Sequence, residues 1–293
     1  MIRMKFITTI AISFQIVTIL FLSCSTIIKE EKDLVHMKMK GDVKQISQFT
    51  YLAIEKFGEI QKGNRQMNIY GPDEQNMVLT FNNRGYLIER KNFSKEGIYS
   101  GKLTFGYDNH FRRVEVFGYN IQEKRDYEAM SIFDEGKKIK TTTIKYTSTI
   151  PDDAISVKYF DNENRIIRED WLSTNGSLSS RSNTKYDVKG NGYEHNVYGS
   201  NGELFSKTEN KFDEVGNVIE TYNKLGLSSI PSHQYYKYDD SRNLIEEVSS
   251  PTGIVNRTTY KYKYDKHRNW IERIRYLNER IPIDLTERII EYY

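Results

Sequence analysis

An aromatic residue followed by aspartate or asparagine recurs along most of this 293-residue chain. Successive copies lie 26 residues apart, except for one step of 27. The aromatic positions are Phe81, Tyr107, Phe133, Phe160, Tyr186, Phe212, Tyr238 and Tyr264. A fixed period of 20–50 residues is typical of repeat architectures, in which each copy is one supersecondary unit. This period therefore constrains the fold more than any other feature of the sequence.

Each copy has the residue pattern of a β-hairpin. In the last copy the alternating run 260–264 ends in Asp265, and Asn269 then precedes the apolar pair Trp270-Ile271. Aromatic and β-branched residues favour strands, and aspartate accepts a hydrogen bond from the backbone two residues on, which opens a turn. Glycine and asparagine tolerate the positive φ angles of hairpin loops. The expected turn aspartates are Asp108, Asp134, Asp161, Asp187, Asp213, Asp239 and Asp265.

A second turn signal lies half a period away, as in Asn175-Gly176, Asn201-Gly202 and Thr252-Gly253. Two strands for each copy predict an all-β fold in which tandem hairpins form an elongated, twisted antiparallel meander. An opening strand is expected near residues 43–54 and a closing strand at 287–293. Some copies, such as that of Ile132-Phe133, place apolar residues on both faces. Either both faces are covered there or a β-bulge shifts the register.

The N-terminus has the pattern of an export signal. Arg3 and Lys5 precede an apolar stretch, residues 6–22, and the single cysteine of the chain follows at Cys24. This order predicts a lipoprotein signal peptide at 1–23 and lipidation of Cys24. An ordinary secretory signal with an incidental cysteine and an uncleaved membrane anchor are the alternatives. We expect a polar tether at 24–40, the repeat domain at 41–293, and a lipid-anchored location at the bacterial outer membrane, periplasmic or surface-exposed.

Composition and motifs argue against several functions. The 43 basic and 40 acidic residues are balanced, without the basic block of a nucleic-acid-binding protein. No HExxH, GxSxG or P-loop motif occurs, and the five histidines lie in unrelated frames. One cysteine cannot form a Cys–His metal set. We therefore expect a protein that is not an enzyme and that has no cofactor and no metal site.

Two features have alternative interpretations as ligand sites. The evenly spaced aspartates could form a row of oxygen ligands for Ca²⁺, although opening a turn already explains them. Trp171 falls outside the repeated core position and has the charged neighbours Arg168, Glu169 and Asp170. It is a candidate platform for a ligand, and the alternative is a strand residue packed on the sheet.

The motif Tyr-x-Tyr-Asp-x-x-x-Asn-Leu-Ile-Glu at residues 236–246 resembles the YD repeats of RHS-type proteins. The opening at 39–58 is similar to that of small YD-repeat lipoproteins of Bacteroidetes. The resemblance covers about residues 75–275, although the period is longer than usual for YD repeats and no RHS core motif follows. It implies a cell-envelope β-repeat protein with a non-catalytic binding or scaffolding role, and some YD-repeat proteins bind carbohydrate.

This resemblance leaves the partner open. We expect the protein to be attached to the membrane through its N-terminal lipid and to bind a glycan or an envelope protein. A carbohydrate-binding outer-membrane lipoprotein is therefore the alternative function. Lys29-Glu30-Glu31-Lys32-Asp33 also resembles the acidic patch that directs some Bacteroidetes lipoproteins to the cell surface.

Overall fold

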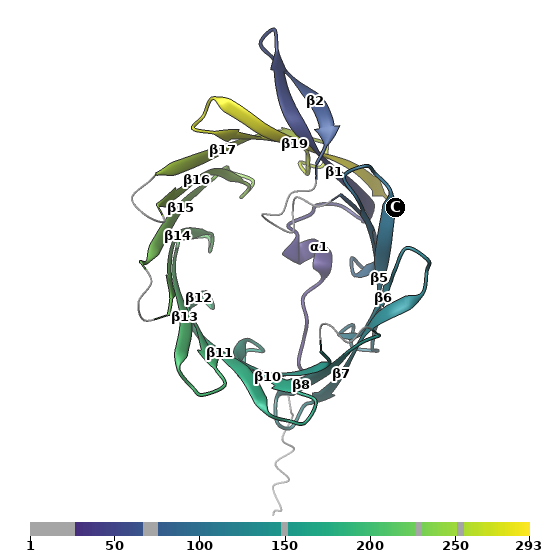
Figure 1. The fold of residues 1–293 in the computed structure, drawn as a ribbon, viewed down its shortest axis with the longest axis vertical. Coiled ribbons are helices and arrows are strands. Elements are labelled where there is room, and N and C mark those ends of the chain that lie inside the picture. The colour runs from purple at the N-terminus through teal and green to yellow at the C-terminus, as the bar shows by residue number, and fades with distance from the viewer. Residues whose placement is uncertain (1–26, 67–75, 148–151, 227–229, 251–254) are drawn as a thin grey trace, which may run out of the picture.

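The computed structural model describes residues 27–66, 76–147, 152–226, 230–250 and 255–293. Within these ranges it has nineteen antiparallel strands and one short helix (Figure 1). No helix in the described residues is long and apolar enough to cross a membrane. In chain order the elements are α1 (Asp33–His36), β1 (Val43–Lys56), β2 (Glu59–Arg65), β3 (Met77–Phe81), β4 (Leu87–Phe93), β5 (Tyr99–Tyr107), β6 (Arg113–Tyr119), β7 (Arg125–Asp134), β8 (Ile139–Tyr146), β9 (Ala154–Phe160), β10 (Ile166–Ser173), β11 (Leu178–Tyr186), β12 (Gly192–Gly199), β13 (Leu204–Phe212), β14 (Val218–Leu225), β15 (Ser232–Tyr238), β16 (Leu244–Ser250), β17 (Asn256–Tyr264), β18 (Trp270–Leu277) and β19 (Ile281–Tyr292).

The sheet closes into a barrel. From β3 to β19 each strand pairs with the next one in the chain, and β1 pairs with β19 from Val43↔Tyr292 to Leu52↔Asp284 (Figure 1). Both β2 and β3 pair with β1, so the ring has eighteen strand positions. The all-β antiparallel prediction is confirmed, but the open, elongated meander is wrong. The two strands expected at opposite ends of the sheet pair with each other.

Repeated β-bulges explain the curvature that brings those two strands together. In seven of the hairpins the register shifts beside the turn by one extra residue on the returning strand. These residues are Ile88, Val114, Ile167, Tyr193, Ile219, Ile245 and Ile271. A bulge bends its strand and increases the local twist. Because the bulges recur at the same place in the repeat, their bends add in one direction and close the sheet.

The turn aspartates hold the loops at one end of the barrel. Asp213 Oδ1 accepts the backbone N–H groups of Val215 (3.1 Å) and Asn217 (2.7 Å), and Oδ2 accepts the Asn217 side-chain amide (2.8 Å). Gly216 supplies the positive φ of 86° that the loop needs. The carboxylates of Asp108, Asp161, Asp187, Asp239 and Asp265 likewise accept the N–H of the residue four positions on.

Asp134 departs from this geometry. It pairs with Ile139 inside the β7–β8 ladder, which has no register shift, and its carboxylate accepts the Lys137 N–H at 3.0 Å. This copy is the one followed by the 27-residue step. The copy with the extra residue thus has a turn that begins after its aspartate, one position later than in the other copies, and this turn has no bulge beside it.

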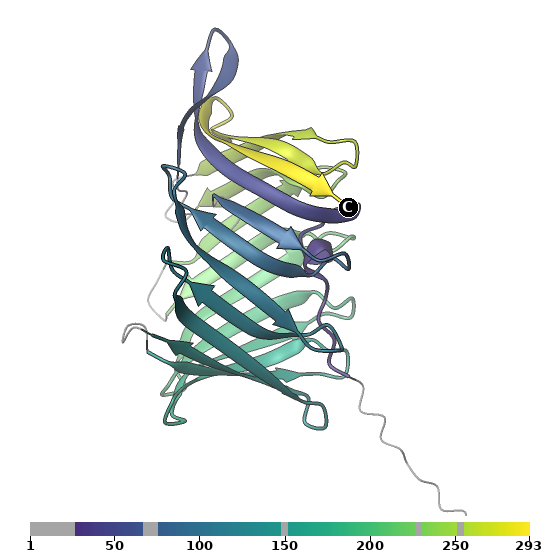
Figure 2. The ribbon, with the colours of Figure 1, turned by 90° about the vertical axis from the view of Figure 1, so that its right-hand side faces the viewer.

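The chain before β1 lies inside the barrel mouth and is not a free tether. We call residues 27–42 the strap; it runs within the ring on the side of the turn aspartates (Figures 1 and 2). Its Leu34 forms a buried apolar cluster with the inner faces of β1 and β3, including Ile46, Leu79 and Phe81. The expected tether at 24–40 is therefore docked from residue 27 onward, because its apolar side chains cover the seam of the barrel.

Removal of a turn carboxylate should weaken the fold in a pH-dependent way. Burial acts to raise the pKa of Asp161, but hydrogen bonds from Arg165 outweigh it and hold this pKa below its ordinary value. We expect Asp161→Ala to lower the free energy of unfolding in urea by about 1–2 kcal/mol at pH 7. Because the folded pKa is lowered, the difference from wild type should persist above about pH 4 and shrink as the pH falls below it.

Asp134→Ala is the matched control, since that carboxylate lies in the turn without the bulge, where it accepts the Lys137 N–H in place of the N–H four positions on. Its loss should be clearly smaller. Equal losses in the two variants, or a difference from wild type that does not change below pH 4, would contradict the role given to the repeated turn.

Candidate functional site

Contacts with the strap identify which face of each strand looks inward. The Tyr107 hydroxyl oxygen lies 3.0 Å from Asp33 Oδ2, and the Lys38 ammonium lies 5.9 Å from the centre of the Tyr238 ring. Because side chains alternate along a strand, Lys237 beside Tyr238 must point outward. The same alternation assigns the faces of the neighbouring strands, since paired residues share a face.

The outer wall carries a repeated row of ion pairs. Lys185–Glu194 (2.8 Å), Lys211–Glu220 (2.7 Å), Lys237–Glu246 (2.9 Å) and Lys263–Glu272 (2.7 Å) each bridge the two strands of one hairpin. Successive pairs lie 26 residues apart along the chain. The lysine side chains are 60–71% exposed, so each pair adds little to stability. What the row does is cover this side of the barrel with charge.

A tighter ionic cluster lies on the same outer face at β10 and β11. Asp170 is 4% exposed and accepts hydrogen bonds from Arg168 Nε (2.8 Å) and Arg181 Nε (2.7 Å). Burial acts to raise the pKa of Asp170, but the two arginines outweigh it and hold the pKa at about 2. The carboxylate is therefore ionised at neutral pH, and its charge is matched on both sides.

The inner wall from β11 to β15 has a different chemistry. It is lined by hydroxyl and amide groups that bond across the strands, as in Thr208 to Asn223 (2.7 Å) and Thr221 to Asn210 (2.9 Å). Alternation also places Ser182, Thr184, His195, Gln234 and Tyr236 on this face. Hydroxyl and amide groups both donate and accept hydrogen bonds. This wall thus offers neutral polar groups where the outer wall offers charges.

Trp171 faces the interior of the barrel. It pairs with Ser156 and Ser180, and lies two residues from Glu169, which accepts a hydrogen bond from Ser156 at 2.6 Å. Trp171 is 38% exposed. Because part of the indole remains open toward the interior, the geometry is compatible with Trp171 as a platform for a ligand.

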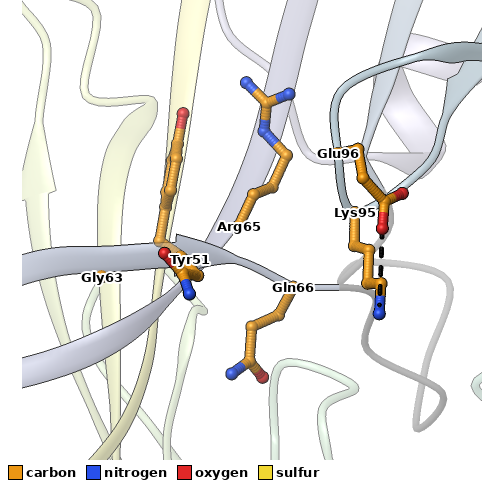
Figure 3. Close-up of a pocket in the computed structure, with 7 residues that line it drawn as sticks. Tyr51, Gly63, Arg65, Gln66, Lys95 and Glu96 are labelled. Atoms are coloured by element: carbon orange, nitrogen blue, oxygen red, sulfur yellow. Dashed lines mark ion pairs between the residues drawn. The ribbon is translucent and has the colours of Figure 1, made fainter.

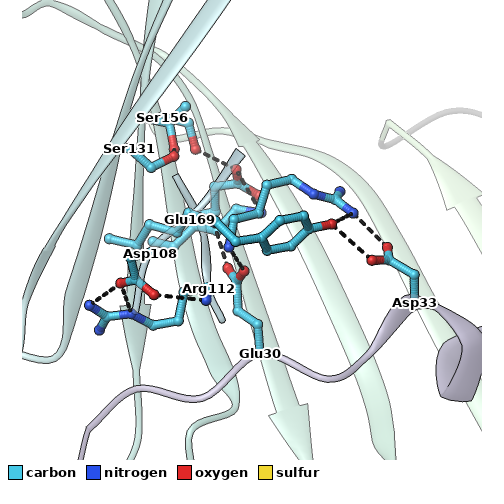
Figure 4. A network of polar contacts seen from close by, with 12 residues as sticks. Glu30, Asp33, Asp108, Arg112, Ser131, Ser156 and Glu169 are labelled. Atoms are coloured by element: carbon cyan, nitrogen blue, oxygen red, sulfur yellow. Dashed lines mark hydrogen bonds and ion pairs between the residues drawn. The ribbon is translucent and has the colours of Figure 1, made fainter. Parts of the chain in front are cut away.

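A polar network fixes the strap to β4–β8 (Figure 4). Glu30 accepts hydrogen bonds from the Lys140 ammonium (2.5 Å) and the Arg113 N–H (2.7 Å). Asp33 accepts from the Leu87 N–H (2.9 Å), and its other oxygen pairs with the Arg113 guanidinium (2.5 Å). The acidic residues that resemble a surface-export signal thus include two that bind to the barrel wall.

A pocket of about 440 Å³ lies between the strap and β15–β18. Residues 36–40 form one side of it. The barrel contributes the aromatic side chains Tyr238, Tyr260, Tyr262 and Trp270 and the cations Arg242, Arg268, Arg273 and Arg288. Burial raises the pKa values of Tyr260 and Tyr262, so both hydroxyls stay protonated at neutral pH. The pocket is thus cationic and aromatic.

A second hollow, of about 930 Å³, lies where the β1–β2 hairpin projects beyond the ring (Figure 3). Tyr51, Arg65 and Gln66 line this hollow together with Lys95 and Glu96, which form an ion pair. The Arg65 guanidinium lies 4.5 Å from the centre of the Phe49 ring, on the outer face.

The structure separates the other candidate residues. Each turn aspartate bonds within its own hairpin, and the described ranges contain no group of three His, Cys, Asp or Glu suited to a metal ion. His195 alone among the histidines lies on the neutral inner wall, bonded to Thr184 at 3.0 Å. The signal peptide, Cys24 and the turn Thr252-Gly253 lie outside the described residues.

The sequence alone did not indicate the pocket between the strap and β15–β18, or the polar network that fixes the strap to β4–β8. The pocket joins residues 36–40 to residues more than 200 positions later, and no local pattern links them. One available signal was the alternation in Tyr260-Lys261-Tyr262-Lys263, which separates an aromatic face from a cationic one. In the closed ring the tyrosines of this segment lie on the inner wall and the lysines on the outer wall.

Several solved structures are similar to this chain. A porin-like protein from Bacteroides uniformis is 8% identical with a TM-score of 0.47, and one from Bacteroides vulgatus is 12% identical with a TM-score of 0.38. Each match covers 86% of this chain and 98% of the other. The complex TcdB2–TccC3–Cdc42 matches with 10% identity and a TM-score of 0.27, over 71% of this chain and 16% of that one.

No family model and no curated protein matches the sequence. At identities of 8–12% and TM-scores below 0.5, the similar structures transfer no function to this chain. The function is therefore inferred from the side chains of the barrel walls and of the pocket beside the strap.

Loss of Asp33 should release the strap. This carboxylate joins Leu87, Tyr107 and Arg113 to the strap, so Asp33→Ala removes three anchors at once. We expect hydrogen exchange at the Leu34 amide, which donates to the Gly85 carbonyl at 3.1 Å, to accelerate by about tenfold or more.

Mass spectrometry of peptides covering residues 30–40 would measure this exchange, with peptides from β12 as an internal reference. Glu31→Ala is the matched control, because that side chain is exposed. Unchanged exchange in the Asp33 variant, or equal acceleration in both variants, would show that the strap is held by other contacts.

Proposed function

We propose that this protein is a non-catalytic binding protein of the bacterial envelope, lipid-anchored through Cys24, whose barrel stands in water beside the membrane. The 26-residue hairpin period supports its placement among YD-repeat proteins. One observation carries the proposal: a row of Lys–Glu ion pairs lies on the outside of the ring, whereas the inner wall from β11 to β15 carries neutral hydroxyl and amide groups.

This distribution is opposite to that of a barrel immersed in lipid. Barrels that cross a membrane turn an apolar band outward, and a lysine or arginine at mid-membrane depth costs about 2–4 kcal/mol. Here Lys185, Lys211, Lys237 and Lys263 recur on the outer wall near the aspartate rim, each beside a glutamate. The Asp170 cluster adds charge midway along β10 on the same face. Immersing these groups in lipid would be unfavourable, whereas water solvates them. The lipid then supplies the attachment that the wall does not.

The inner wall is the ligand surface in this proposal. Hydroxyl and amide groups such as those of Thr208, Asn210 and Asn223 match the hydrogen-bonding groups of a hydroxyl-rich solute. Trp171 adds a partly exposed indole face on the same side. Stacking of a ring on an aromatic face, together with neutral hydrogen bonding, favours saccharide binding over peptide scaffolding as the second, more specific function.

The position of the barrel can be tested by separating it from its lipid. The mature chain secreted from a cleavable signal peptide, and therefore without lipid, should fractionate with soluble periplasmic proteins. The natural chain should remain with membranes and incorporate labelled palmitate in a manner that requires Cys24. If the unlipidated barrel stayed in the membrane after carbonate extraction, the outer wall would be in contact with lipid and the proposal would be wrong.

Saccharide binding can be tested with neutral oligosaccharides of four to six residues, followed by tryptophan fluorescence and calorimetry. We expect Trp171→Ala to weaken binding by about tenfold, in line with the loss of one stacking platform. Tyr235→Ala is the matched control, since Tyr235 is 47% exposed but pairs with Glu220 on the outer face. Binding that survives in the Trp171 variant would exclude the inner wall as the saccharide surface.

A further inference from the structure

We propose that the pocket between residues 36–40 and β15–β18 is a second binding site, which takes a carboxylate-bearing saccharide of the hexuronate class. The inference rests on the proposed binding function and adds a chemical class to it. It is drawn from the charge, the aromatic lining and the size of this pocket.

Charge is the first argument. Among its described lining residues the pocket has six cationic side chains and no carboxylate: Lys38, Lys40, Arg242, Arg268, Arg273 and Arg288. A concave site lined by one sign of charge concentrates ligands of the opposite sign. Guanidinium groups also recognise carboxylates through paired hydrogen bonds. The pocket therefore selects an anion.

The carboxylates around this pocket belong to the barrel wall and its turns. Asp284 is 1% exposed and accepts a hydrogen bond from Arg275 Nε at 2.7 Å. Glu247, on the inner face of β16, contributes with burial to the raised pKa of Tyr260. Asp239 and Asp265 are held by the backbone of the turns that they stabilise. None of these acids lines the pocket, so the groups that a ligand meets there are cationic, aromatic or neutral.

The aromatic lining narrows the class of anion. The Arg288 guanidinium lies 3.5 Å from the centre of the Trp270 ring, and Tyr262 packs beside the same indole with ring centres 6.0 Å apart. Arg288 Nε also donates to Gln48 at 2.7 Å, which fixes the planar cation in place. A floor of rings and an immobilised guanidinium suit a ligand that has both a ring and a carboxylate. Inorganic anions would use only the charge.

Size agrees with this class. About 440 Å³ lies within the range of small-molecule sites and is ample for a short oligosaccharide. The Asn243 and Asn269 side chains lie at the edge of the pocket. The Asn243 amide donates to Asp239 in its own turn at 3.1 Å, and the Asn269 amide donates to the Lys40 carbonyl of the strap at 2.8 Å. Because the strap forms one side, the site exists only when residues 36–40 are docked.

Two arginines at the pocket edge can be replaced without straining the backbone. Arg242 and Arg268 have φ angles of 67° and 63°, and Asn164 occupies the same turn position in another copy with 63°. The double variant Arg242→Asn/Arg268→Asn therefore removes two charges with a residue that the turn accepts. Lys266→Gln is the matched control, because it removes an exposed charge from the same turn as Arg268 but outside the pocket lining.

Calorimetry on the full lipidated chain in detergent would compare tetragalacturonate, neutral maltotetraose and inorganic phosphate. We expect tetragalacturonate binding to weaken at least tenfold in the double variant and less than twofold in Lys266→Gln, with strong salt dependence in the wild type. Phosphate should bind far more weakly than tetragalacturonate. Absence of tetragalacturonate binding, or equal affinity in the wild type and the double variant, would overturn the inference.

The same double variant distinguishes the pocket from the inner wall around Trp171. Neutral oligosaccharide binding is assigned to the surface around Trp171, so it should be unchanged in the double variant. Loss of acidic binding alone would support the pocket, and loss of neutral binding in the same variant would show that the two surfaces are one site. Phosphate binding as tight as that of tetragalacturonate would show that the pocket is a general anion site and would overturn the saccharide assignment.

Discussion

Pairing between β1 and β19 is the interaction on which the rest of the structure depends. All other ladders join strands close in sequence, whereas Val43↔Tyr292 joins positions almost the whole chain apart. Inside this seam Thr50 and Thr286 share a hydrogen bond at 3.0 Å, and both are fully buried. Without this ladder there would be two free sheet edges, no interior, and no wall against which the strap could pack. Long-range pairing of this kind also forms late and slowly, because it must close a large loop.

The repeat explains how the chain reaches that closure. In three copies the tyrosine before the turn aspartate reaches back to the previous hairpin, where its hydroxyl donates to a carbonyl beside the bulge: Tyr107 to Leu87, Tyr186 to Ile166 and Tyr238 to Val218, each at 2.8 Å. The bulge interrupts the ladder at this point, and the hydroxyl provides a partner beside it. In the last copy Tyr262 makes the corresponding bond to Leu244 at 2.7 Å. These copies are thus linked to the preceding hairpin beside its bulge.

Where the repeat has phenylalanine, a cation can take over the link. The Arg112 guanidinium in one turn lies 3.9 Å from the centre of the Phe133 ring in the next copy. Arg112 also bonds to its own Asp108 through Nε at 2.7 Å. At this place on the rim the aspartate, its cation and the next aromatic ring are therefore joined, and phenylalanine is linked to the preceding copy by a cation where tyrosine uses its hydroxyl.

Local features of this fold are readable from the sequence, and global ones are not. Strand alternation and turn residues predict the hairpins, because both depend on interactions within a few residues of Asp213 or Gly216. Closure depends on the sum of many small bends, and a single bulge residue such as Ile219 looks like any other strand isoleucine. Docking of the strap is not readable from the sequence for the same reason: Glu30 and Asp33 find their partners only after the ring exists. Trp171 was identified as unusual, but its face could be assigned only from the register.

Docking of the strap shortens the distance between the barrel and any lipid on Cys24. Ile28 is fully buried, and its N–H donates to Glu135 at 2.8 Å, in the turn between β7 and β8. Ile28 is four positions after Cys24, and a fully extended chain spans about 3.3–3.6 Å for each position, so the reach is about 14 Å. A lipidated barrel would hold its aspartate rim close against the bilayer headgroups. Solutes would then reach the pocket between the strap and β15–β18 through the opposite opening of the barrel, because the membrane surface would cover the aspartate rim.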